Sequence, residues 1–220
     1  MLPDALPLAA LTPPALLCLL AVSALVLSDL RDWRVGRYLC KPLAAAAFVW
    51  LALRLGAGDT PYGAWLLAGL LLCLLGDLLL MPEDERCFLA GLGAFLIGHL
   101  LYAVAFTRLP LNLSGLLASA VPALLLMALA LRWMLPHVPA QMKLPVTLYT
   151  AVITAMLLSA GLTWGLPAAP WILAGAWGFA LSDLAVARQQ FVRPSALNRV
   201  WGTPLYFGAQ MLLAASVGLA

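Results

Sequence analysis

Charged side chains are scarce in this chain of 220 residues, where Asp, Glu, Lys and Arg together make up 10%. In soluble domains about a quarter of the residues are charged and about half are apolar. Here 65% of the residues are hydrophobic, and the mean hydropathy is +1.02. The net charge of the chain, +3, is small, and the basic residues are scattered over short loops. No nucleic-acid partner is therefore expected. The composition predicts an integral membrane protein.

Several catalytic and metal-binding motifs are also missing. The sequence has no GxSxG elbow, no HExxH pair, no P-loop and no GxGxxG turn. The four cysteines show no CxxC or paired spacing and are expected to be small apolar residues or free thiols: Cys18, Cys40, Cys73 and Cys87. No metal site is therefore predicted.

Long hydrophobic runs fill the rest of the chain. A helix crosses a bilayer in about 20 residues. Apolar windows between polar or Pro/Gly breaks predict eight transmembrane helices near 6–28, 41–56, 62–81, 87–107, 113–134, 143–163, 168–187 and 198–219. The first run lacks a basic leader segment and is interpreted as a retained helix. The connecting loops are short, so residues 1–220 are expected to form a single polytopic, all-α membrane domain.

Basic residues are distributed unevenly between the loops. Of the twelve Lys and Arg residues, only Arg54 and Arg108 fall near the even-numbered connections. The remaining ten lie near the odd-numbered ones: Arg31, Arg34, Arg37, Lys41, Arg86, Arg132, Lys143, Arg188, Arg193 and Arg199. By the positive-inside rule the odd connections face the cytoplasm, and both termini are non-cytoplasmic.

A weak internal repeat supports the same count of helices. "LAGLLLCLLGDLLL" (67–80) aligns with "LAGAWGFALSDLAV" (173–186) at six of fourteen positions, including one Gly and one Asp. The helices that precede and follow these segments also resemble each other. Two four-helix halves in the same orientation would place matched residues across a central cavity.

Asp77 and Asp183 are the strongest candidates for chemistry. An aspartate at the centre of a membrane helix costs about 2.5–3.5 kcal/mol, so such residues face the bundle interior and mark functional sites. Both lie one to two turns from the cytoplasmic ends of their helices. We expect the two side chains to converge in one interior cavity on that side; the alternative is that each reaches the interface or pairs with an arginine.

Two further polar pairs are predicted to line the same cavity. His99 and Tyr102 are three residues apart, and Tyr206 and Gln210 are four apart, so each pair shares a helix face. Each residue could instead make only an interhelical hydrogen bond. Lys41 is predicted to begin the second helix, either as a membrane anchor or as a ligand for a phosphate. Asn198, at the mouth of the last helix, is placed in the substrate site.

These residues resemble the YhhN-like family of membrane proteins, which includes the TMEM86 lysoplasmalogenases. The resemblance lies in "KPL" (41–43), "GDLLL" (76–80), "FLAGLGAFLIGHLLY" (88–102), "SDL" (182–184) and "PLYFGAQMLL" (204–213). It implies an eight-helix bundle that hydrolyses the vinyl-ether bond of lysoplasmalogens to a fatty aldehyde and a glycerophospho-alcohol. It also implies that Asp77 and Asp183 are the catalytic pair. The implied partners are a lysophospholipid substrate and the surrounding membrane lipids.

The chemistry of a vinyl ether agrees with two carboxylates. Hydrolysis needs proton delivery to the β-carbon and capture of the resulting oxocarbenium ion by water, so one acid must be neutral while the other is charged. Two carboxyl groups in a low-dielectric pocket tend toward that state, because ionisation of the first opposes that of the second. The pair titrates jointly, so acid and base are not assigned from sequence. No metal or organic cofactor is required.

Two other functions fit the same residues. In a proton-coupled transporter or lipid carrier, paired acids would relay protons while two repeated halves rock. In a structural membrane protein, the polar groups would only lock the bundle. A transporter needs a path to both faces, whereas a hydrolase needs a closed pocket with a lateral lipid entrance. The sequence indicates no oligomeric state.

Overall fold

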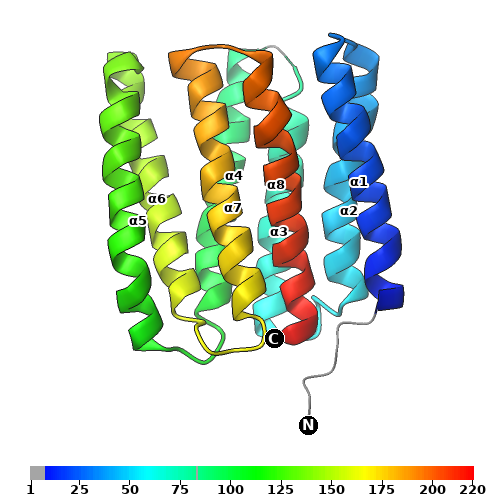
Figure 1. The fold of residues 1–220 in the computed structure, drawn as a ribbon, viewed down its shortest axis with the longest axis vertical. Helices are drawn as coiled ribbons and strands as arrows, with labels where there is room; N and C mark the ends of the chain where they lie inside the picture. The colour runs from blue at the N-terminus through cyan, green and yellow to red at the C-terminus, as the bar shows by residue number, and fades with distance from the viewer. Residues whose placement is uncertain (1–7, 83) are drawn as a thin grey trace.

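The computed structural model describes residues 8–82 and 84–220, and these form an all-helical bundle (Figure 1). Its long elements are α1 (Leu8–Leu30), α2 (Arg34–Arg54), α3 (Pro61–Leu79), α4 (Glu85–Phe106), α5 (Leu113–Met134), α6 (Lys143–Gly161), α7 (Ala169–Ala187) and α8 (Ala196–Ser216). Short helical turns lie at Leu135–His137, Ala140–Met142, Arg188–Val192 and Val217–Leu219. The predicted eight helices are confirmed for the described residues; the first two residues of the predicted span 6–28 lie outside them.

Capping residues fix several helix starts. Thr60 accepts a hydrogen bond from the amide of Gly63 and precedes Pro61, which suits the first helical position of α3. The side chain of Asp84 accepts a hydrogen bond from the amide of Cys87 at the start of α4 (2.9 Å), and the backbone amide of Cys87 lowers the pKa of this carboxyl group. These caps let α3 and α4 begin sharply after short connections.

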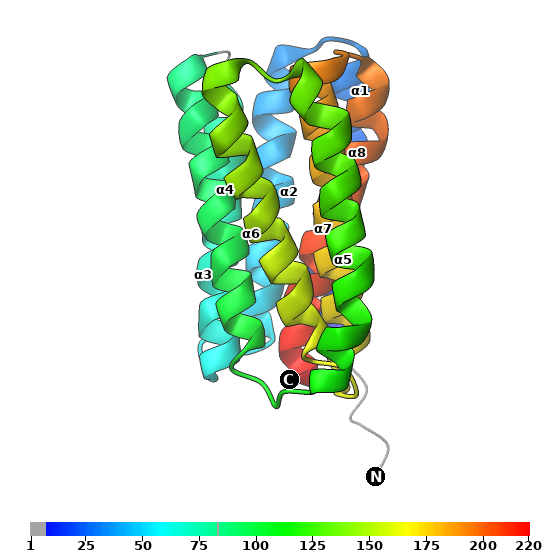
Figure 2. The ribbon, with the colours of Figure 1, turned by 90° about the vertical axis from the view of Figure 1, so that its left-hand side faces the viewer.

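Neighbouring helices pack as antiparallel pairs. The closest pairs are α1 with α2, α3 with α4, α5 with α6 and α7 with α8. α2 also packs on α3 and α8, and α6 also packs on α4 and α7. Helices α5 and α1 lie at opposite edges of the bundle in Figure 1, and Figure 2 shows α5 and α6 on the outside. The start of α1 and the C-terminus lie at the same end, as an even number of antiparallel helices requires.

Six of the described helices are long and apolar enough to cross a membrane: α1 and α3 to α7. The two others, α2 and α8, have 21 residues each but carry more polar side chains. The chain is therefore a multi-pass integral membrane protein. Of its two most polar helices, α2 packs against α3 and α8 packs against α7.

One helix boundary corrects the sequence analysis. The second span was predicted to begin at Lys41, but α2 begins at Arg34, so Lys41 lies two turns inside the helix. By helix rise this moves Lys41 about 10 Å from the start of α2. Hydropathy misses this start because Arg34 and Arg37 lower the average of the first two turns. As a result Lys41 reaches a buried site instead of the loop.

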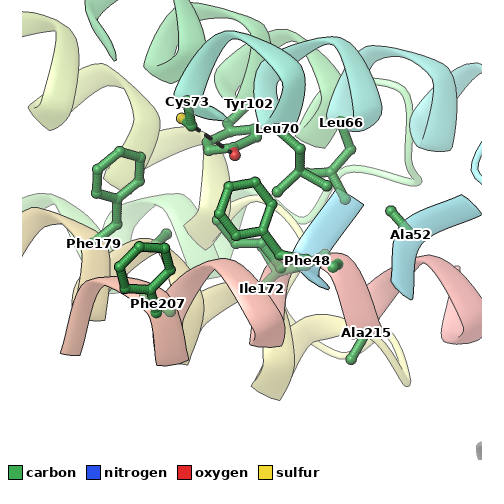
Figure 3. Packing of buried hydrophobic residues seen from close by; sticks show 14 of the residues in the cluster. Phe48, Ala52, Leu66, Leu70, Cys73, Tyr102, Ile172, Phe179, Phe207 and Ala215 are labelled. Atoms are coloured by element: carbon green, nitrogen blue, oxygen red, sulfur yellow. Dashed lines mark hydrogen bonds between the residues drawn. The ribbon is translucent and has the colours of Figure 1, made fainter. Parts of the chain in front are cut away.

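Aromatic rings and small residues fill the centre of the bundle (Figure 3). Phe48 of α2 and Phe207 of α8 pack with ring centroids 6.3 Å apart, and Phe179 of α7 is also fully buried. Ala44 and Ala45 have no exposed surface, which lets α2 approach its neighbours closely. Membrane helices associate mainly through such close packing, because lipid tails are as apolar as the core.

Candidate active site at one end of the bundle

A cavity of about 440 Å³ opens at the end of the bundle where α1 joins α2, α3 joins α4 and α7 joins α8. This end lies opposite the C-terminus, at the top of Figure 1. The charged side chains that line the cavity are Asp29, Arg34, Arg37, Lys41, Asp77, Asp183 and Arg199. Both aspartates singled out from the sequence therefore line one cavity, as the shared depth of their helices predicted.

Asp77 lies near the end of α3 and has a side chain only 2% exposed. The ammonium Nζ of Lys41 lies 3.3 Å from its Oδ1. The hydroxyl of Tyr206 donates a hydrogen bond to its Oδ2 over 2.7 Å. The carboxyl group thus has a cation from α2 on one oxygen and a donor from α8 on the other, and both partners stabilise its charged form.

Asp183 lies near the end of α7 and has a side chain 15% exposed. The hydroxyl of Tyr149 on α6 donates to its Oδ2 over 3.1 Å, and Nε2 of His99 on α4 lies 3.4 Å from the same oxygen. The contact with His99 is long and does not meet hydrogen-bond geometry. Neither of these partners is a permanent cation.

The tautomer of His99 follows from its other ring nitrogen. Nδ1 lies 2.7 Å from the carbonyl oxygen of Phe95, which can only accept, so Nδ1 carries the hydrogen. In neutral imidazole Nε2 is then an acceptor that faces Asp183. Two acceptors repel each other, so the arrangement is favourable when His99 and Asp183 hold one proton between them.

A layer of aromatic rings forms the floor of the cavity. The ring of Tyr206 lies 5.8 Å from that of Phe95 and 5.4 Å from that of Phe179, measured between centroids. His99 stacks on Phe179 at 4.0 Å. Phe95 and Tyr206 line the cavity, whereas Phe179 lies behind them. These rings separate the cavity from the polar groups deeper in the bundle.

Three residues predicted to line the cavity lie beneath this layer. His99, Tyr102 and Gln210 have no exposed surface and are not among the lining residues. The hydroxyl of Tyr102 donates to Oε1 of Gln210 over 2.6 Å, and it lies 3.6 Å from the sulfur of Cys73, the contact drawn in Figure 3. The predicted cavity lining is therefore correct for Tyr206 and wrong for these three, although His99 still touches Asp183 from below.

Asn198 lines the cavity, but its amide group is fully engaged. Its Oδ1 accepts a hydrogen bond from Arg188 over 2.5 Å, and its Nδ2 donates to Gln189 and to the carbonyl of Arg193, each over 2.9 Å. These partners all belong to the connection between α7 and α8. The side chain thus ties this connection to the start of α8.

Arginines surround the mouth of the cavity. Arg37 pairs with Asp32 at 2.9 Å and lies 3.7 Å from Asp29. Nε of Arg199 lies 3.9 Å from the same oxygen of Asp29. Arg34 lines the mouth as well. The mouth therefore presents guanidinium groups, the side chains best shaped to bind a phosphate.

Tyr149 is the main residue of the site that sequence reasoning missed. It has the same relation to Asp183 that Tyr206 has to Asp77. A tyrosine inside a predicted span needs a partner for its hydroxyl, which was the available signal. Among residues 8–82 and 84–220, no group of three or more His, Cys, Asp and Glu side chains is arranged to hold a metal ion.

The helices and the cavity define a multi-pass helical membrane protein with a carboxylate-containing pocket near one end of its bundle. Residues 36–217 match the YhhN family, and the chain belongs to it.

Named relatives span most of the chain. It is 31% identical to lysoplasmalogenase TMEM86A of Bos taurus, over 84% of this chain and 78% of that protein. It is 34% identical to lysoplasmalogenase TMEM86B of Sus scrofa, over 86% of this chain and 77% of that protein. A lysoplasmalogenase of Mycobacterium tuberculosis is 33% identical, over 69% of this chain and 59% of that protein. No solved structure matches the chain.

Proposed function

We propose that this protein is a lysoplasmalogenase, a hydrolase that cleaves the vinyl-ether bond of a lysoplasmalogen into a fatty aldehyde and a glycerophospho-alcohol. The observation that carries the proposal is a pair of aspartates in one cavity with unlike partners: a lysine ammonium beside Asp77, and a tyrosine hydroxyl and a histidine ring beside Asp183. The names of the relatives that match most of the chain point to the same reaction.

The unlike partners divide the work of the two acids. The ammonium of Lys41 stabilises the ionised form of Asp77. Asp183 has only Tyr149 and His99 as partners, and a neutral acid beside a neutral imidazole avoids placing a second buried ion pair in the site. Asp183 is therefore the proton donor, and Asp77 is the base.

The first step is proton transfer from the carboxyl group of Asp183 to the β-carbon of the vinyl ether. The carbon–carbon double bond supplies the electron pair for the new C–H bond, and the ether carbon becomes an oxocarbenium ion. Asp183 is left as a carboxylate, and the ionised Asp77 lies in the same cavity as the cation. General acid catalysis of this kind contributes about 10²–10⁴-fold, and the fixed negative charge adds electrostatic stabilisation.

Water then completes the reaction. Its oxygen bonds to the oxocarbenium carbon while Asp77 takes one of its protons, which gives a hemiacetal. The hemiacetal hydroxyl returns a proton to Asp183 as its oxygen forms the aldehyde carbonyl. Asp77 gives its proton to the departing glycerol oxygen. One water is consumed and both acids return to their starting states.

The headgroup lies at the mouth of the cavity in this proposal. Arg34, Arg37 and Arg199 line the mouth and can meet a phosphate with paired N–H donors. Lys41 was expected either to take this role or to anchor the helix; in this proposal it acts on Asp77 instead, which its ammonium approaches to 3.3 Å. Asn198, which lines the same cavity, holds the adjacent connection in place through its hydrogen bonds.

The site faces the cytoplasm in this proposal. The cavity is at the end formed by the odd-numbered connections, where most of the basic residues lie. The positive-inside rule puts that end in the cytoplasm and both termini on the other side.

The chain is also proposed to consist of two four-helix halves, α1–α4 and α5–α8. Each aspartate has one partner from the second helix of its own half: Lys41 for Asp77 and Tyr149 for Asp183. Each has another from the last helix of the other half: Tyr206 for Asp77 and His99 for Asp183. This exchange of partners is what a repeat around a central site would produce.

The proposal is tested with purified protein and three lysolipids that share a headgroup: a vinyl ether, a saturated ether and an acyl ester. Only the vinyl ether can form the oxocarbenium ion by protonation, so we expect aldehyde from it and no cleavage of the other two. Cleavage of the acyl ester at a comparable rate would contradict the proposed reaction. Passage of a lysolipid or of protons across proteoliposomes without aldehyde release would favour a transporter.

A further inference from the structure

A second, narrower space adjoins the cavity between α4, α5, α6 and α7, with a volume of about 80 Å³. We call it the apolar groove. It shares with the cavity the side chains of Phe88, Leu92, Tyr149, Asp183, Val186 and Gln190. The two spaces therefore lie side by side, and Asp183 lies at their junction.

Nearly all the side chains that line the apolar groove lack free polar groups. The hydroxyl of Thr150 donates to the carbonyl of Val146 over 2.9 Å, and the hydroxyl of Thr154 donates to the carbonyl of Thr150 over 2.8 Å. Both threonines therefore have their donors satisfied by their own helix. Ala130 and Ala180 leave room where larger residues would fill it. The groove favours a hydrocarbon over water.

The length of the groove follows from α6, whose lining residues run from Val146 to Leu157. These two residues are eleven positions apart, which is about 16 Å along the helix. The hydrocarbon of one leaflet is about 15 Å deep, half the thickness of the bilayer core. The apolar groove is thus as long as one leaflet is deep.

We propose that the apolar groove is the binding site for the single hydrocarbon chain of the lipid substrate, and that it selects chain length. The identity of the lipid rests on the proposed function. The cavity carries the charged groups that suit a phosphate headgroup, and the groove carries none except Asp183 at the junction. In a lysoplasmalogen the vinyl ether is the link between headgroup and chain, so a chain in the groove sets that bond beside Asp183.

Two threonines on α6 allow a matched pair of substitutions, one inside the apolar groove and one outside it. Thr154 lines the groove five residues beyond Tyr149, which is about 7 Å deeper by helix rise. Thr147 is on the same helix, also bonds its hydroxyl to the carbonyl four residues earlier, and does not line the groove. Thr154→Leu should therefore shorten the groove, and Thr147→Leu makes the same chemical change outside it.

The experiment measures binding of saturated-ether lysophospholipids with short and long chains to the full-length protein in detergent. The affinity of each lysolipid is measured by its competition with one fluorescent lysolipid. The ratio of long-chain to short-chain affinity is then compared between variants. We expect Thr154→Leu to lower this ratio about tenfold, because one misplaced methylene group in an apolar pocket costs about 10–200-fold. Thr147→Leu should leave the ratio unchanged.

A second pair of variants keeps the test decisive if Thr154→Leu does not fold. Ala130→Leu narrows the groove near the level of Asp183 and should weaken short and long chains alike, whereas Ala128→Leu changes an exposed neighbour. The proposal would be overturned if the long-to-short affinity ratio were the same in Thr154→Leu and Thr147→Leu. It would also be overturned if Ala130→Leu and Ala128→Leu bound the lysolipids with the same affinity. Saturated ethers are not cleaved, so this result stands apart from the outcome of the hydrolysis assay.

Discussion

Asp77 and Asp183 occupy similar places on α3 and α7, yet their surroundings differ in kind. Asp77 is the more buried of the two and has a cation, Lys41, within 3.3 Å. Asp183 is more open to the cavity and has a tyrosine and a histidine. Two identical side chains thus line one cavity, and their partners differ in charge. Substitutions at the two acids and at their partners test that difference.

The proton donor should be the most sensitive group. Asp183→Asn is nearly isosteric but has no acidic proton, so we expect kcat for the vinyl ether to fall by about 10²–10⁴-fold. Asp59→Asn, an exposed change between α2 and α3 at the other end of the bundle, is the matched control and should retain full activity. Aldehyde release per folded molecule is the readout. If Asp183→Asn kept more than a tenth of the wild-type rate, Asp183 would not be the acid.

Removal of the cation should affect Asp77 without affecting Asp183. Lys41→Met leaves the carboxylate of Asp77 without its cation, and we expect kcat to fall by about 10- to 100-fold because the base is then less often ionised. Lys41→Arg should restore part of the loss. KM should change little, because the proposed function places the phosphate at the arginines of the mouth and not at Lys41. A rise in KM with unchanged kcat would instead make Lys41 a phosphate ligand.

The two tyrosines allow a finer comparison. A hydrogen bond to a charged acceptor contributes about 1.5–3 kcal/mol, and one to a neutral acceptor about 0.5–1.5 kcal/mol. Tyr206→Phe removes a donor from the ionised Asp77 and should lower kcat at least tenfold. Tyr149→Phe removes a donor from Asp183, which is neutral in this proposal, and should lower kcat about two- to twelvefold. Steady-state kinetics of both variants measures the two losses. If kcat fell more in Tyr149→Phe than in Tyr206→Phe, the roles assigned to the two acids would have to be reversed.

The deeper polar pair should matter for stability rather than for chemistry. Tyr102→Phe removes the hydrogen bond to Gln210 beneath the aromatic layer. Hydrogen bonds between membrane helices contribute about 0.6 kcal/mol on average, with a maximum of about 1.7. We expect a small loss of thermal stability in detergent and an unchanged kcat per folded molecule. A tenfold fall in kcat with unchanged stability would return Tyr102 to the active site.

The sequence was sufficient for the features that depend on hydropathy and depth. The eight helices and the meeting of Asp77 and Asp183 in one cavity follow from apolar windows and from the cost of a charge in lipid. Helix starts were less secure, because the arginines at the beginning of α2 hide two turns of helix and with them the position of Lys41.

The partners of the acids depend on how each helix is rotated about its axis, which spacing along one helix does not determine. His99 and Tyr102 share a face of α4, but that face points below the cavity, toward Phe179 and Gln210. Tyr149 reaches Asp183 only because α6 packs on α7. Side chains from different helices meet through tertiary packing, and no pattern within one segment predicts it.

The claim that Asp183 is neutral while Asp77 is ionised can be measured directly by infrared spectroscopy of the purified protein at neutral pH. A protonated carboxyl group has a carbonyl stretch that is absent from a carboxylate. We predict that the wild-type protein and Asp77→Asn show this band and that Asp183→Asn loses it. A band that is retained in Asp183→Asn and lost in Asp77→Asn would contradict the assignment of the two acids.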